Sequence, residues 1–418
     1  MIVPNASLER RKAGSAPLSA VPPSTSADAF SPREEGIDAR VSVGWDFRLR
    51  FTRQALSPAN AVLREVVEVE PGQGAARMLV VIDGGLREAN PAIVEAVKEY
   101  SAAHHDRIRL VGEPIIVPGG ERAKNDRSVF DNLTRAIHDA GLCRRSYVLA
   151  IGGGAVLDVA GFAAATAHRG VRLIRMPTTT LAQDDSGVGV KNSINAFGKK
   201  NFLGTFAPPW AVINDANFLM TLSDRDWRSG WSECVKVALV KDAGFFESIV
   251  EAVNLLNRRD LDAAAKIIRR SAELHLSHIV RGGDPFELTA ARPLDFGHWA
   301  AHKLEQISGF ALRHGEAVSV GLALDSTYSM LQGWLSKPER DCVVDCLRSL
   351  GLPIFDPLLE DANLLAGVDE FREHLGGRLT LTMLRGIGRA FDVHAVDPGV
   401  VQQAIVRLKG EANRSAAP

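Results

Sequence analysis

The sequence lacks the features that mark several large protein classes. Its four cysteines (Cys143, Cys234, Cys342 and Cys346) form no C-x-x-C pair, which favours a reducing compartment over a disulfide framework. A formal net charge of −1 supplies no basic field for nucleic acid. No apolar run reaches the ~18 residues of a membrane span, and the first ~40 residues lack the apolar core of a secretory signal. We therefore expect a cytoplasmic protein that binds neither nucleic acid nor membrane.

The patterning predicts two domains and an N-terminal extension. Residues 1–40 are rich in Pro, Ser and Ala, so we expect disorder there. Over residues 41–215, strand-like runs at 77–85, 146–154 and 171–180 alternate with helical patterns, which predicts an α/β domain with a parallel sheet and flanking helices. Residues 216–418 read as an all-α domain without convincing strand alternation. Because ligands bind at the carboxyl ends of parallel strands, we expect a site in the cleft between the domains.

Two segments favour a nucleotide in the α/β domain. "AIGGGAVLDVAGF" runs from a strand through Gly153 and Gly154 into a helix, an arrangement that lets the backbone approach a pyrophosphate. It is not the G-x-G-x-x-G fingerprint, and a tight strand–helix turn explains it equally well. The following "PTTT" offers hydroxyl groups to the same crevice. In "PGGERAKN", Glu121 and Lys124 either contact a nucleotide or belong to a solvated loop.

A polar segment at residues 182–209 is typical of anion binding. "AQDDSGVGVKNSINAFGKKNFLGTFAPP" concentrates Lys191, Lys199, Lys200 and Asn201 near glycines, between apolar flanks. We interpret it as a loop that binds a phosphorylated substrate through charge-assisted hydrogen bonds. The alternative is a surface loop with solvated lysines.

Three histidines and one glutamate suggest a metal site in the helical region. His298, His302 and His314 lie within 27 residues, at 292–318. Glu233 and Lys236 lie three apart on a predicted helix, where a salt bridge is the simplest reading. One carboxylate and two imidazoles, with positions left open, is a usual arrangement for catalytic zinc. The alternative is that the histidines are satisfied core residues.

Taken in order, these motifs resemble the sugar phosphate cyclase superfamily, to which 3-dehydroquinate synthase belongs. The likeness covers residues 77–408 and rests on "GGGAVLDVAGF", "PTTTLAQDDSGVGVK", "GKKNFLGTF", "ECVK", "DFGHWAAHKLE" and "HGEAV". The resemblance implies a dehydroquinate synthase-like fold, NAD as cofactor, and a bound divalent ion, zinc or cobalt. It also implies a homodimer and a small sugar phosphate as substrate.

The resemblance also implies roles for single residues. Glu233, His298 and His314 match the metal ligands. The cofactor-side positions are Asp83, Glu121, Lys124, Gly153, Gly154, Asp158, Thr178, Thr179, Asp185 and Lys200. The substrate-side positions are Arg169, Lys191, Asn201, Lys236, Arg292, Asp295 and His302, with Arg169 reaching a substrate phosphate from a neighbouring subunit in some members. Lys191, Lys236, His302 and Asp185 are expected to take part in catalysis.

The family reaction fits these residues. NAD⁺ oxidises a ring alcohol, phosphate leaves by elimination, the hydride returns, and an intramolecular aldol addition closes a carbocycle. The chain is therefore expected to be a carbon–oxygen lyase that acts on phosphates.

Departures from the dehydroquinate synthase pattern concern the substrate. Asp295 stands where an asparagine is usual, and Arg292 is displaced by one residue. A lysine that holds the substrate carboxylate is replaced by Ser277 or His278. Because an aspartate repels a carboxylated substrate unless it pairs with Arg292 or Lys303, the sequence favours sedoheptulose 7-phosphate and a valiolone-type product. The usual phosphate-contacting lysine is also altered, and the candidates to replace it are Arg372 and His374.

Two rival functions remain open. A 3-dehydroquinate synthase acting on a seven-carbon keto acid phosphate would need Arg292 and His278 to rebuild the carboxylate site. A metal-dependent polyol dehydrogenase shares the glycine-rich turn and paired histidines, but an unphosphorylated polyol leaves the lysine-rich segment without a purpose.

Overall fold

The computed structural model describes residues 30–33, 36–39, 41, 43–282, 286, 293–374 and 379–415. The chain divides into two units, residues 1–45 and 46–418. In the first unit, β1 (Phe30–Arg33) and β2 (Gly36–Ala39) pair as antiparallel strands. The expectation of disorder did not anticipate this hairpin, because Pro32 argues against a strand. The remaining residues of the predicted disordered segment lie outside the described residues.

A parallel sheet forms the first half of the second unit. Its strands follow the order β3-β11-β8-β7-β4-β5, with β6 also paired to β4, and every pair is parallel. The sheet therefore has one carboxyl-terminal edge, as predicted. The strands are β3 (Arg48–Thr52), β4 (Ala76–Asp83), β5 (Ile108–Leu110), β6 (Ile115–Val117), β7 (Tyr147–Gly152), β8 (Arg172–Pro177) and β11 (Ala211–Asp215).

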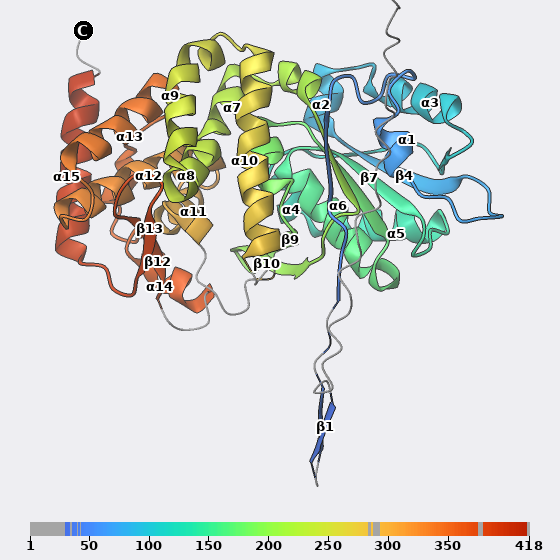
Figure 1. The fold of residues 1–418 in the computed structure, drawn as a ribbon, viewed down its shortest axis with the longest axis horizontal. Helices are drawn as coiled ribbons and strands as arrows, with labels where there is room; N and C mark the ends of the chain where they lie inside the picture. Colours follow the sequence, from blue (N-terminus) through green and yellow to red (C-terminus); the bar gives the residue numbers. More distant parts are fainter. Residues whose placement is uncertain are drawn as a thin grey trace, which may run out of the picture. The chain divides into compact units, whose positions relative to one another are not determined.

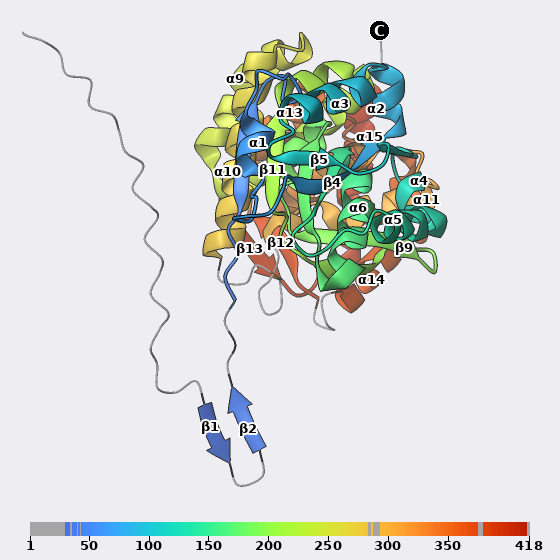
Figure 2. The same ribbon diagram turned by 90° about the vertical axis from the view of Figure 1, so that its right-hand side faces the viewer.

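Helices cover both faces of the sheet, which explains why its central strands read as nearly continuous apolar runs (Figure 2). One core contains Leu63, Ile93 and Tyr147, and the other contains Leu133 and Val148. The confirmed fold class is thus a parallel sheet with flanking helices. The helices are α1 (Val62–Val66), α2 (Gly84–Ala89), α3 (Ile93–Ala103), α4 (Arg122–Asn125), α5 (Arg127–Asp139) and α6 (Gly154–Thr166).

The polar segment 182–209 is not the irregular loop that we expected. It begins with a single π-helical turn, η2 (Ala182–Ser186), and continues as a hairpin of β9 (Lys191–Ala196) and β10 (Lys199–Phe206). Phe197 and Gly198 connect the strands with φ angles of 54° and 72°. Positive φ at both central residues is the requirement of a tight hairpin turn that follows the twist of the strands. Phenylalanine is an unusual residue at such a position, so the sequence did not reveal the turn.

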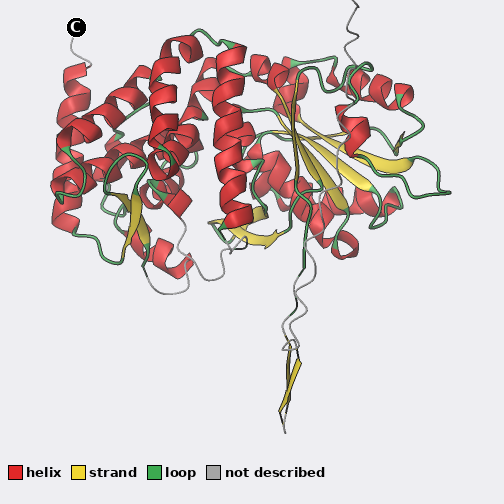
Figure 3. Ribbon diagram, viewed as in Figure 1, coloured by secondary structure: helices red, strands yellow, loops and turns green. Residues whose placement is uncertain are grey.

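Helices dominate from residue 224 onward and pack around one large core (Figures 1 and 3). α10 packs against η2 and against α8, at the boundary with the sheet region. The helices are α7 (Asp224–Ser229), α8 (Trp231–Lys241), α9 (Ala243–Asn257), α10 (Leu261–Arg281), α11 (His298–Ile307), α12 (His314–Leu331), α13 (Lys337–Ser349), α14 (Ala366–His374) and α15 (Pro398–Ser415).

Three details refine the predictions for this region. β12 (Leu381–Leu384) and β13 (Ala390–Val393) form an antiparallel pair, and at four residues each they are too short for a periodic signal. Cys346 is buried as expected, but Cys342 is exposed, so only one of the two belongs to the core. Among the described residues, no helix is long and apolar enough to cross a membrane. The domain boundaries at 40 and 215 stay predictions.

Candidate active site

One buried carboxylate and two imidazoles converge where α8, α11 and α12 meet. Glu233 lies on α8, while His298 and His314 are the first residues of α11 and α12. Oε1 of Glu233 lies 3.4 Å from Nε2 of His298 and 3.2 Å from Nε2 of His314. Ligand atoms of the three side chains lie within 4.8 Å of one another, close enough to share one metal ion. The predicted ligands are therefore brought together in a set that suits catalytic zinc.

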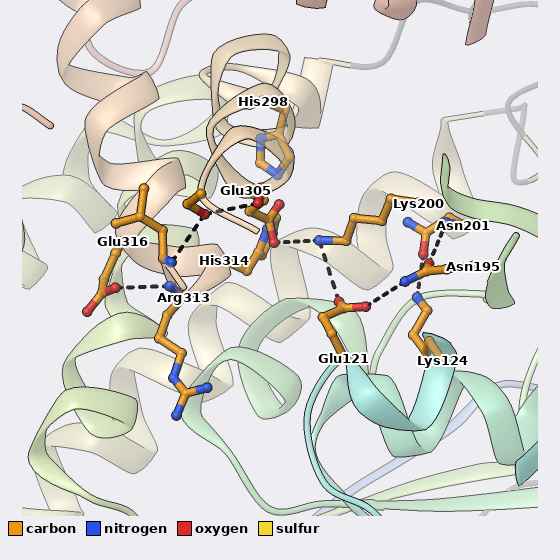
Figure 4. Close-up of polar contacts among 12 residues, drawn as sticks. Glu121, Lys124, Asn195, Lys200, Asn201, His298, Glu305, Arg313, His314 and Glu316 are labelled. Carbon is orange, nitrogen blue, oxygen red and sulfur yellow. Dashed lines mark hydrogen bonds and ion pairs between the residues drawn. The ribbon is translucent and has the colours of Figure 1, made fainter. Parts of the chain in front are cut away.

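Each of the two imidazoles is held on its other side by an acceptor. Nδ1 of His298 lies 3.1 Å from the carbonyl oxygen of Phe296, and Nδ1 of His314 lies 3.0 Å from Oε2 of Glu305. An acceptor at Nδ1 holds a ring proton on that side, so Nε2, which faces Glu233, is the nitrogen left for a metal ion to take. Both rings are thus presented as metal ligands, and Figure 4 shows Glu305 beside His314.

The start of α11 is fixed by a buried aspartate of α12. Asp325 accepts hydrogen bonds from the backbone N–H of Gly297 and from the indole N–H of Trp299, both at 2.9 Å. Gly297 has a φ of 78°, and a Cβ there would lie 2.8 Å from the backbone nitrogen of Leu322. Only glycine fits this position without strain. The two contacts bracket His298 and set the position of its ring.

The electrostatics of the cluster favour a cation. Burial opposes the ionisation of Glu233, yet Lys236 and His298 hold its pKa well below the usual value. Burial also disfavours a charge on His314, but Glu305 raises the pKa of that imidazole to about 9. The surrounding carboxylates therefore stabilise positive charge at the place where a metal ion would bind. These residues fit the divalent ion that the resemblance implies.

Asp185, on η2, contacts the ion pair that Glu233 and Lys236 form on α8. Nζ of Lys236 lies 2.5 Å from Oε2 of Glu233, as their spacing predicts, and 3.3 Å from Oδ2 of Asp185. Nδ1 of His275, on α10, contacts the other oxygen of Asp185. Burial opposes the ionisation of Asp185, but Lys236 and His275 lower its pKa to about 2. Asp185 is therefore an ionised hydrogen-bond acceptor at neutral pH.

His302 lies beside the two candidate ligands. Its ring centroid is 5.4 Å from that of His298 and 6.0 Å from that of His314. His302, Glu305 and His314 form a second group whose atoms lie within 4.8 Å. Burial, reinforced by His298 and Lys200, lowers the pKa of His302 well below its usual value. The ring is therefore neutral at pH 7 and suited to hydrogen bonding.

The glycine-rich turn is packed tightly against the ends of neighbouring strands. A Cβ at Gly154 would lie 2.8 Å from Oγ of Ser186, and one at Gly153 would lie 3.3 Å from Cγ2 of Thr179. Asp83 accepts from the backbone N–H of Gly153 at 3.4 Å. The turn thus places the start of α6 at the carboxyl edge of the sheet, where a pyrophosphate fits. The predicted cofactor residues that meet here are Asp83, Gly153, Gly154, Thr178 and Thr179.

A second group of predicted residues surrounds the ammonium of Lys124. Lys124 is 3% exposed, and its Nζ lies 2.6 Å from Oδ2 of Asp158 and contacts Oδ1 of Asn201. Oγ of Ser193 donates to the same two acceptors at 3.2 and 3.0 Å. The hairpin β9–β10 is therefore attached to α4 and α6 through cofactor-side and substrate-side positions.

A third group connects the hairpin to the metal cluster. Nζ of Lys200 lies 2.6 Å from Oε1 of Glu305 and 3.6 Å from Oε1 of Glu121. Oε2 of Glu121 accepts from Nδ2 of Asn195 at 2.9 Å. Figure 4 shows the resulting chain of contacts from His314 through Glu305 and Lys200 to Glu121. Cofactor-side residues and metal ligands are thus linked by side chains from both halves of the unit.

Arg169 is not brought to this cluster. Arg169 is exposed after α6, at the end opposite to Gly154, and the 13 residues of that helix span about 20 Å. Within one chain it therefore lies far from the glycine turn. Lys191 is exposed at the start of β9. Arg292 lies outside the described residues.

The structure places two residues that the sequence left as alternatives. Nζ of Lys303 lies 2.6 Å from Glu370 of α14, so Lys303 pairs with that glutamate and not with Asp295. Arg372 is exposed and contacts Asp369, and its role toward the phosphate stays a prediction. The side chain of His374 lies outside the described residues.

Sequence reasoning missed two residues of the site. Glu305 ends the "HKLE" stretch three residues after His302, a spacing that places both on one face of α11. The prediction named Ser277 and His278 of α10 and did not include His275. Nδ1 of His278 instead lies 3.4 Å from Nζ of Lys241. The signal for His275 was its place on the face of α10 that packs on η2, which a single sequence does not display.

Comparisons with known proteins point to one family. A family model described as 3-dehydroquinate synthase N-terminal matches residues 114–229, and one described as 3-dehydroquinate synthase C-terminal matches residues 230–368. A 3-dehydroquinate synthase of Acidithiobacillus ferrooxidans is 35% identical over 292 residues, which are 70% of this chain and 79% of that protein. One of Pseudomonas syringae pv. tomato is 37% identical over 299 residues, or 70% of this chain and 80% of that protein.

Solved structures extend the comparison. The 2-epi-5-epi-valiolone synthase ValA of Streptomyces hygroscopicus subsp. jinggangensis, with NAD⁺ and Zn²⁺ bound, is 30% identical with a TM-score of 0.80, covering 89% of this chain and 99% of that one. A 2-deoxy-scyllo-inosose synthase complexed with carbaglucose-6-phosphate, NAD⁺ and Co²⁺ is 23% identical with a TM-score of 0.71, covering 85% and 95%. An NADH-dependent butanol dehydrogenase of Thermotoga maritima, 14% identical with a TM-score of 0.61 and covering 88% and 98%, shares the fold alone.

Proposed function

Because this chain belongs to the 3-dehydroquinate synthase family of sugar phosphate cyclases, we propose that it converts sedoheptulose 7-phosphate to a valiolone-type cyclitol with loss of phosphate. Enzymes of this family eliminate phosphate from a sugar phosphate, so the class of reaction follows from membership. The substrate is the proposal. Its support is the residue at position 295 and the likeness to a valiolone synthase at 30% identity over nearly all of that chain.

Asp295 carries the argument for the substrate. It ends the short helix η4 (Pro293–Asp295), three residues before His298. Its Oδ2 atom is buried and has no hydrogen-bond partner in the described part of the chain. A buried carboxylate oxygen without a donor is costly unless a ligand supplies one. A substrate hydroxyl satisfies this oxygen, whereas a substrate carboxylate is repelled by it.

Lys236 offsets the charge of Asp295 only in part, because it also contacts two other carboxylates. Burial disfavours the ammonium of Lys236, but Asp185 and Glu233 raise its pKa, and Asp295 adds to the same effect. Lys236 therefore already pairs with the carboxylates of Asp185 and Glu233. A substrate carboxylate would add a further negative charge to this group, while a hydroxyl adds none.

NAD and a divalent ion are proposed as cofactors. When bound, NAD⁺ takes up and returns a hydride, and the ion polarises substrate oxygens. Glu233, His298 and His314 would hold the ion. The start of α6 at Gly153 and Gly154 would face a pyrophosphate, and Thr178, Thr179 and Asp83 line the same turn. Lys124, Asp158, Glu121 and Lys200 would complete the cofactor side.

The remaining side chains would bind and orient the substrate. Asn201 presents an amide beside Lys124, and Lys191 extends the same hairpin. Lys236 holds a positive charge where negative charge develops on substrate oxygens during elimination and aldol closure. His302 is neutral and offers a hydrogen-bonding ring nitrogen without adding charge. These roles need no further acid or base for the phosphate elimination itself.

The test is to offer two substrates to the purified protein with NAD⁺ and Zn²⁺ or Co²⁺. Sedoheptulose 7-phosphate should release phosphate and yield a cyclitol of the expected mass, while the keto acid phosphate used by 3-dehydroquinate synthase should not. Asp295→Asn should shift the ratio of kcat/KM values toward the keto acid by about 30-fold, the equivalent of roughly 2 kcal/mol. Asp345→Asn, a substitution of the same kind at a 70% exposed side chain, should leave the ratio unchanged.

The second candidate is 3-dehydroquinate synthase itself, favoured by relatives of that name at 35–37% identity. Phosphate release from the keto acid alone would establish it and overturn the cyclitol proposal. A polyol dehydrogenase has only fold-level likeness in its favour. Accumulation of NADH with an unphosphorylated polyol would point to it.

We also propose that the active form is a homodimer. Arg169 is exposed and distant from the glycine turn of its own chain, so a second copy is needed for it to meet a substrate phosphate. Analytical ultracentrifugation would measure the mass in solution. Mixing an Arg169→Ala chain with a chain that lacks a metal ligand should restore activity if sites are shared, and no restoration would contradict the shared site.

A further inference from the structure

His275 reaches the active site from α10, the helix on which the sequence prediction named Ser277 and His278 instead. It lies on α10, and its side chain is 13% exposed. α10 packs against η2 and α8, so this face of the helix looks toward Asp185 and Lys236. Nδ1 of His275 contacts Oδ1 of Asp185, while Oδ2 of the same carboxylate lies 3.3 Å from Nζ of Lys236.

The contact with Asp185 determines which nitrogen of His275 is available. A carboxylate beside Nδ1 keeps a proton on that nitrogen and leaves the lone pair on Nε2. Within the described part of the chain, Nε2 makes no hydrogen bond and is not among the buried atoms that lack a partner. Nε2 therefore has access to solvent, with its lone pair free.

The other titratable groups of the site are poorly matched to proton transfer at neutral pH. Burial opposes the ionisation of Asp185, but Lys236 lowers its pKa to about 2, so it is a weak base. Lys236 is held charged by its carboxylates, and burial lowers the pKa of His302 well below its usual value. His298 and His314 face Glu233 as metal ligands.

The geometry of His275 suits proton transfer. A carboxylate holds one ring nitrogen, and the other nitrogen keeps a lone pair that can accept a proton. Asp185 on η2 contacts this imidazole, and Lys236 on α8 contacts Asp185; the titratable groups that interact with this pair are Asp184 on η2, Glu233 on α8 and Asp295 on η4. Lys236 is paired with Asp185 and Glu233, and burial raises the pKa of Asp184 well above its usual value, so Asp185 is the ionised carboxylate that holds the ring.

We infer that His275 and Asp185 form a proton-transfer dyad for the transient oxidation of the substrate. The O–H bond of the substrate alcohol breaks, its proton forms an N–H bond at Nε2 of His275, and the hydride leaves the same carbon for the nicotinamide cofactor. When the ketone is reduced again, the hydride returns to carbon and His275 returns the proton to oxygen, so no proton is consumed overall. This inference rests on the proposed cyclase reaction, but not on which seven-carbon substrate is used.

The decisive variant separates positioning from proton transfer. In His275→Asn the amide N–H replaces Nδ1–H as donor to Asp185, but no basic nitrogen remains. We expect kcat to fall by at least about 100-fold, and the limb of the kcat/KM profile that rises with pH to disappear. Zinc content and cofactor affinity should not change. Glu273→Gln, two residues earlier on α10 with a side chain 47% exposed, is the matched control and should behave as the unmodified protein.

Retention of kcat and of the rising limb in His275→Asn would overturn the inference and leave His275 as a positioning residue for Asp185. A measurement on the unmodified protein decides the matter if the variant does not fold. Nitrogen-15 NMR of the imidazole rings in the presence of zinc and NAD should show the neutral ring of His275 with its proton on Nδ1. A neutral ring with the proton on Nε2 would contradict the dyad.

The same experiments keep this inference separate from the proposed substrate. If the unmodified protein releases phosphate only from the keto acid, the cyclitol proposal fails and the His275 comparison is made with that substrate. If it releases phosphate from neither, the proposed reaction fails, while the NMR result still decides whether the dyad exists.

Discussion

Oε2 of Glu305 lies 3.0 Å from Nδ1 of His314, on the side of the ring away from Glu233, and the other oxygen of Glu305 lies 2.6 Å from Nζ of Lys200. One buried carboxylate thus orients a candidate metal ligand and holds a lysine of the hairpin. Burial opposes its ionisation, but Lys200 and His314 lower the pKa of Glu305, so the carboxylate stays charged.

Glu305→Gln should weaken zinc binding by about 10- to 100-fold, because the outer partner of a ligating histidine fixes its tautomer and raises its basicity. Competition with a chromogenic chelator measures the affinity. Glu370→Gln is the matched control, because Glu370 pairs with Lys303 of the same helix, also at 2.6 Å, but is 46% exposed. Equal zinc affinity in Glu305→Gln and the control would refute the role of Glu305.

Zinc at 100 times its dissociation constant should raise the free energy of unfolding by about 2.7 kcal/mol. His298→Asn should abolish this gain, because it removes one of the three converging ligands. His302→Asn should retain it, since His302 belongs to the proposed substrate side. Urea titrations with and without zinc provide the measurement. The reverse result, with His302 needed and His298 dispensable, would assign the ion to the second group of His302, Glu305 and His314.

Arg175, on β8, holds the backbone segment that leads into Lys191 and β9. It is fully buried and donates to the carbonyl oxygens of Gly187, Gly189 and Lys191 at 3.1, 2.7 and 2.8 Å. Burial lowers its pKa to about 10, which leaves it charged at neutral pH. Arg175→Lys should destabilise the protein by at least about 2 kcal/mol, because one ammonium leaves several buried acceptors unpaired.

Faster proteolytic cleavage within 187–198 should accompany that loss, because the hairpin would be less firmly attached. Arg172→Lys is the comparison, on the same strand but with a side chain 19% exposed. Unchanged cleavage and stability in Arg175→Lys would show that the guanidinium contributes nothing to the hairpin.

Asp325 should make stability depend on pH. Burial raises its pKa to about 7, against about 3.9 in an unfolded chain. Between these values the folded protein binds more protons than the unfolded one, so the free energy of unfolding falls as pH rises from about 4 to about 7. Above about 7 this contribution is constant, and its full size is at most about 4 kcal/mol.

Asp325→Asn should remove that slope, so its urea midpoint, measured relative to the unmodified protein, should improve from pH 5 to pH 8. Asp345→Asn, at a 70% exposed side chain, should show no such trend. A constant difference between Asp325→Asn and the unmodified protein across this range would rule out a raised pKa at Asp325.

The sequence predicted the helices and strands of the site better than the contacts between them. The strands before Gly153 and Thr178 were recognisable because a strand covered on both faces must be apolar throughout, and β7 and β8 are. Glu233 and Lys236 were predicted to pair because three residues separate neighbours on a helix face, and they do. The hairpin at 191–206 and the pair β12–β13 were not predicted. Short strands and their turns give little periodic signal in the sequence.

What the sequence determined by itself is therefore local: strand and helix patterns, the glycine-rich turn, and the ordered motifs that identify the family. Spacing alone was unable to choose among the histidines, because His298 and His302 share a helix face while His314 lies on another helix. Tertiary packing decided that Glu233 faces His298 and His314, that Glu305 connects His314 to Lys200, and that His275 rather than His278 reaches Asp185. The physical reason is that chain geometry fixes contacts within a few residues, whereas contacts between distant segments exist only once buried faces have packed.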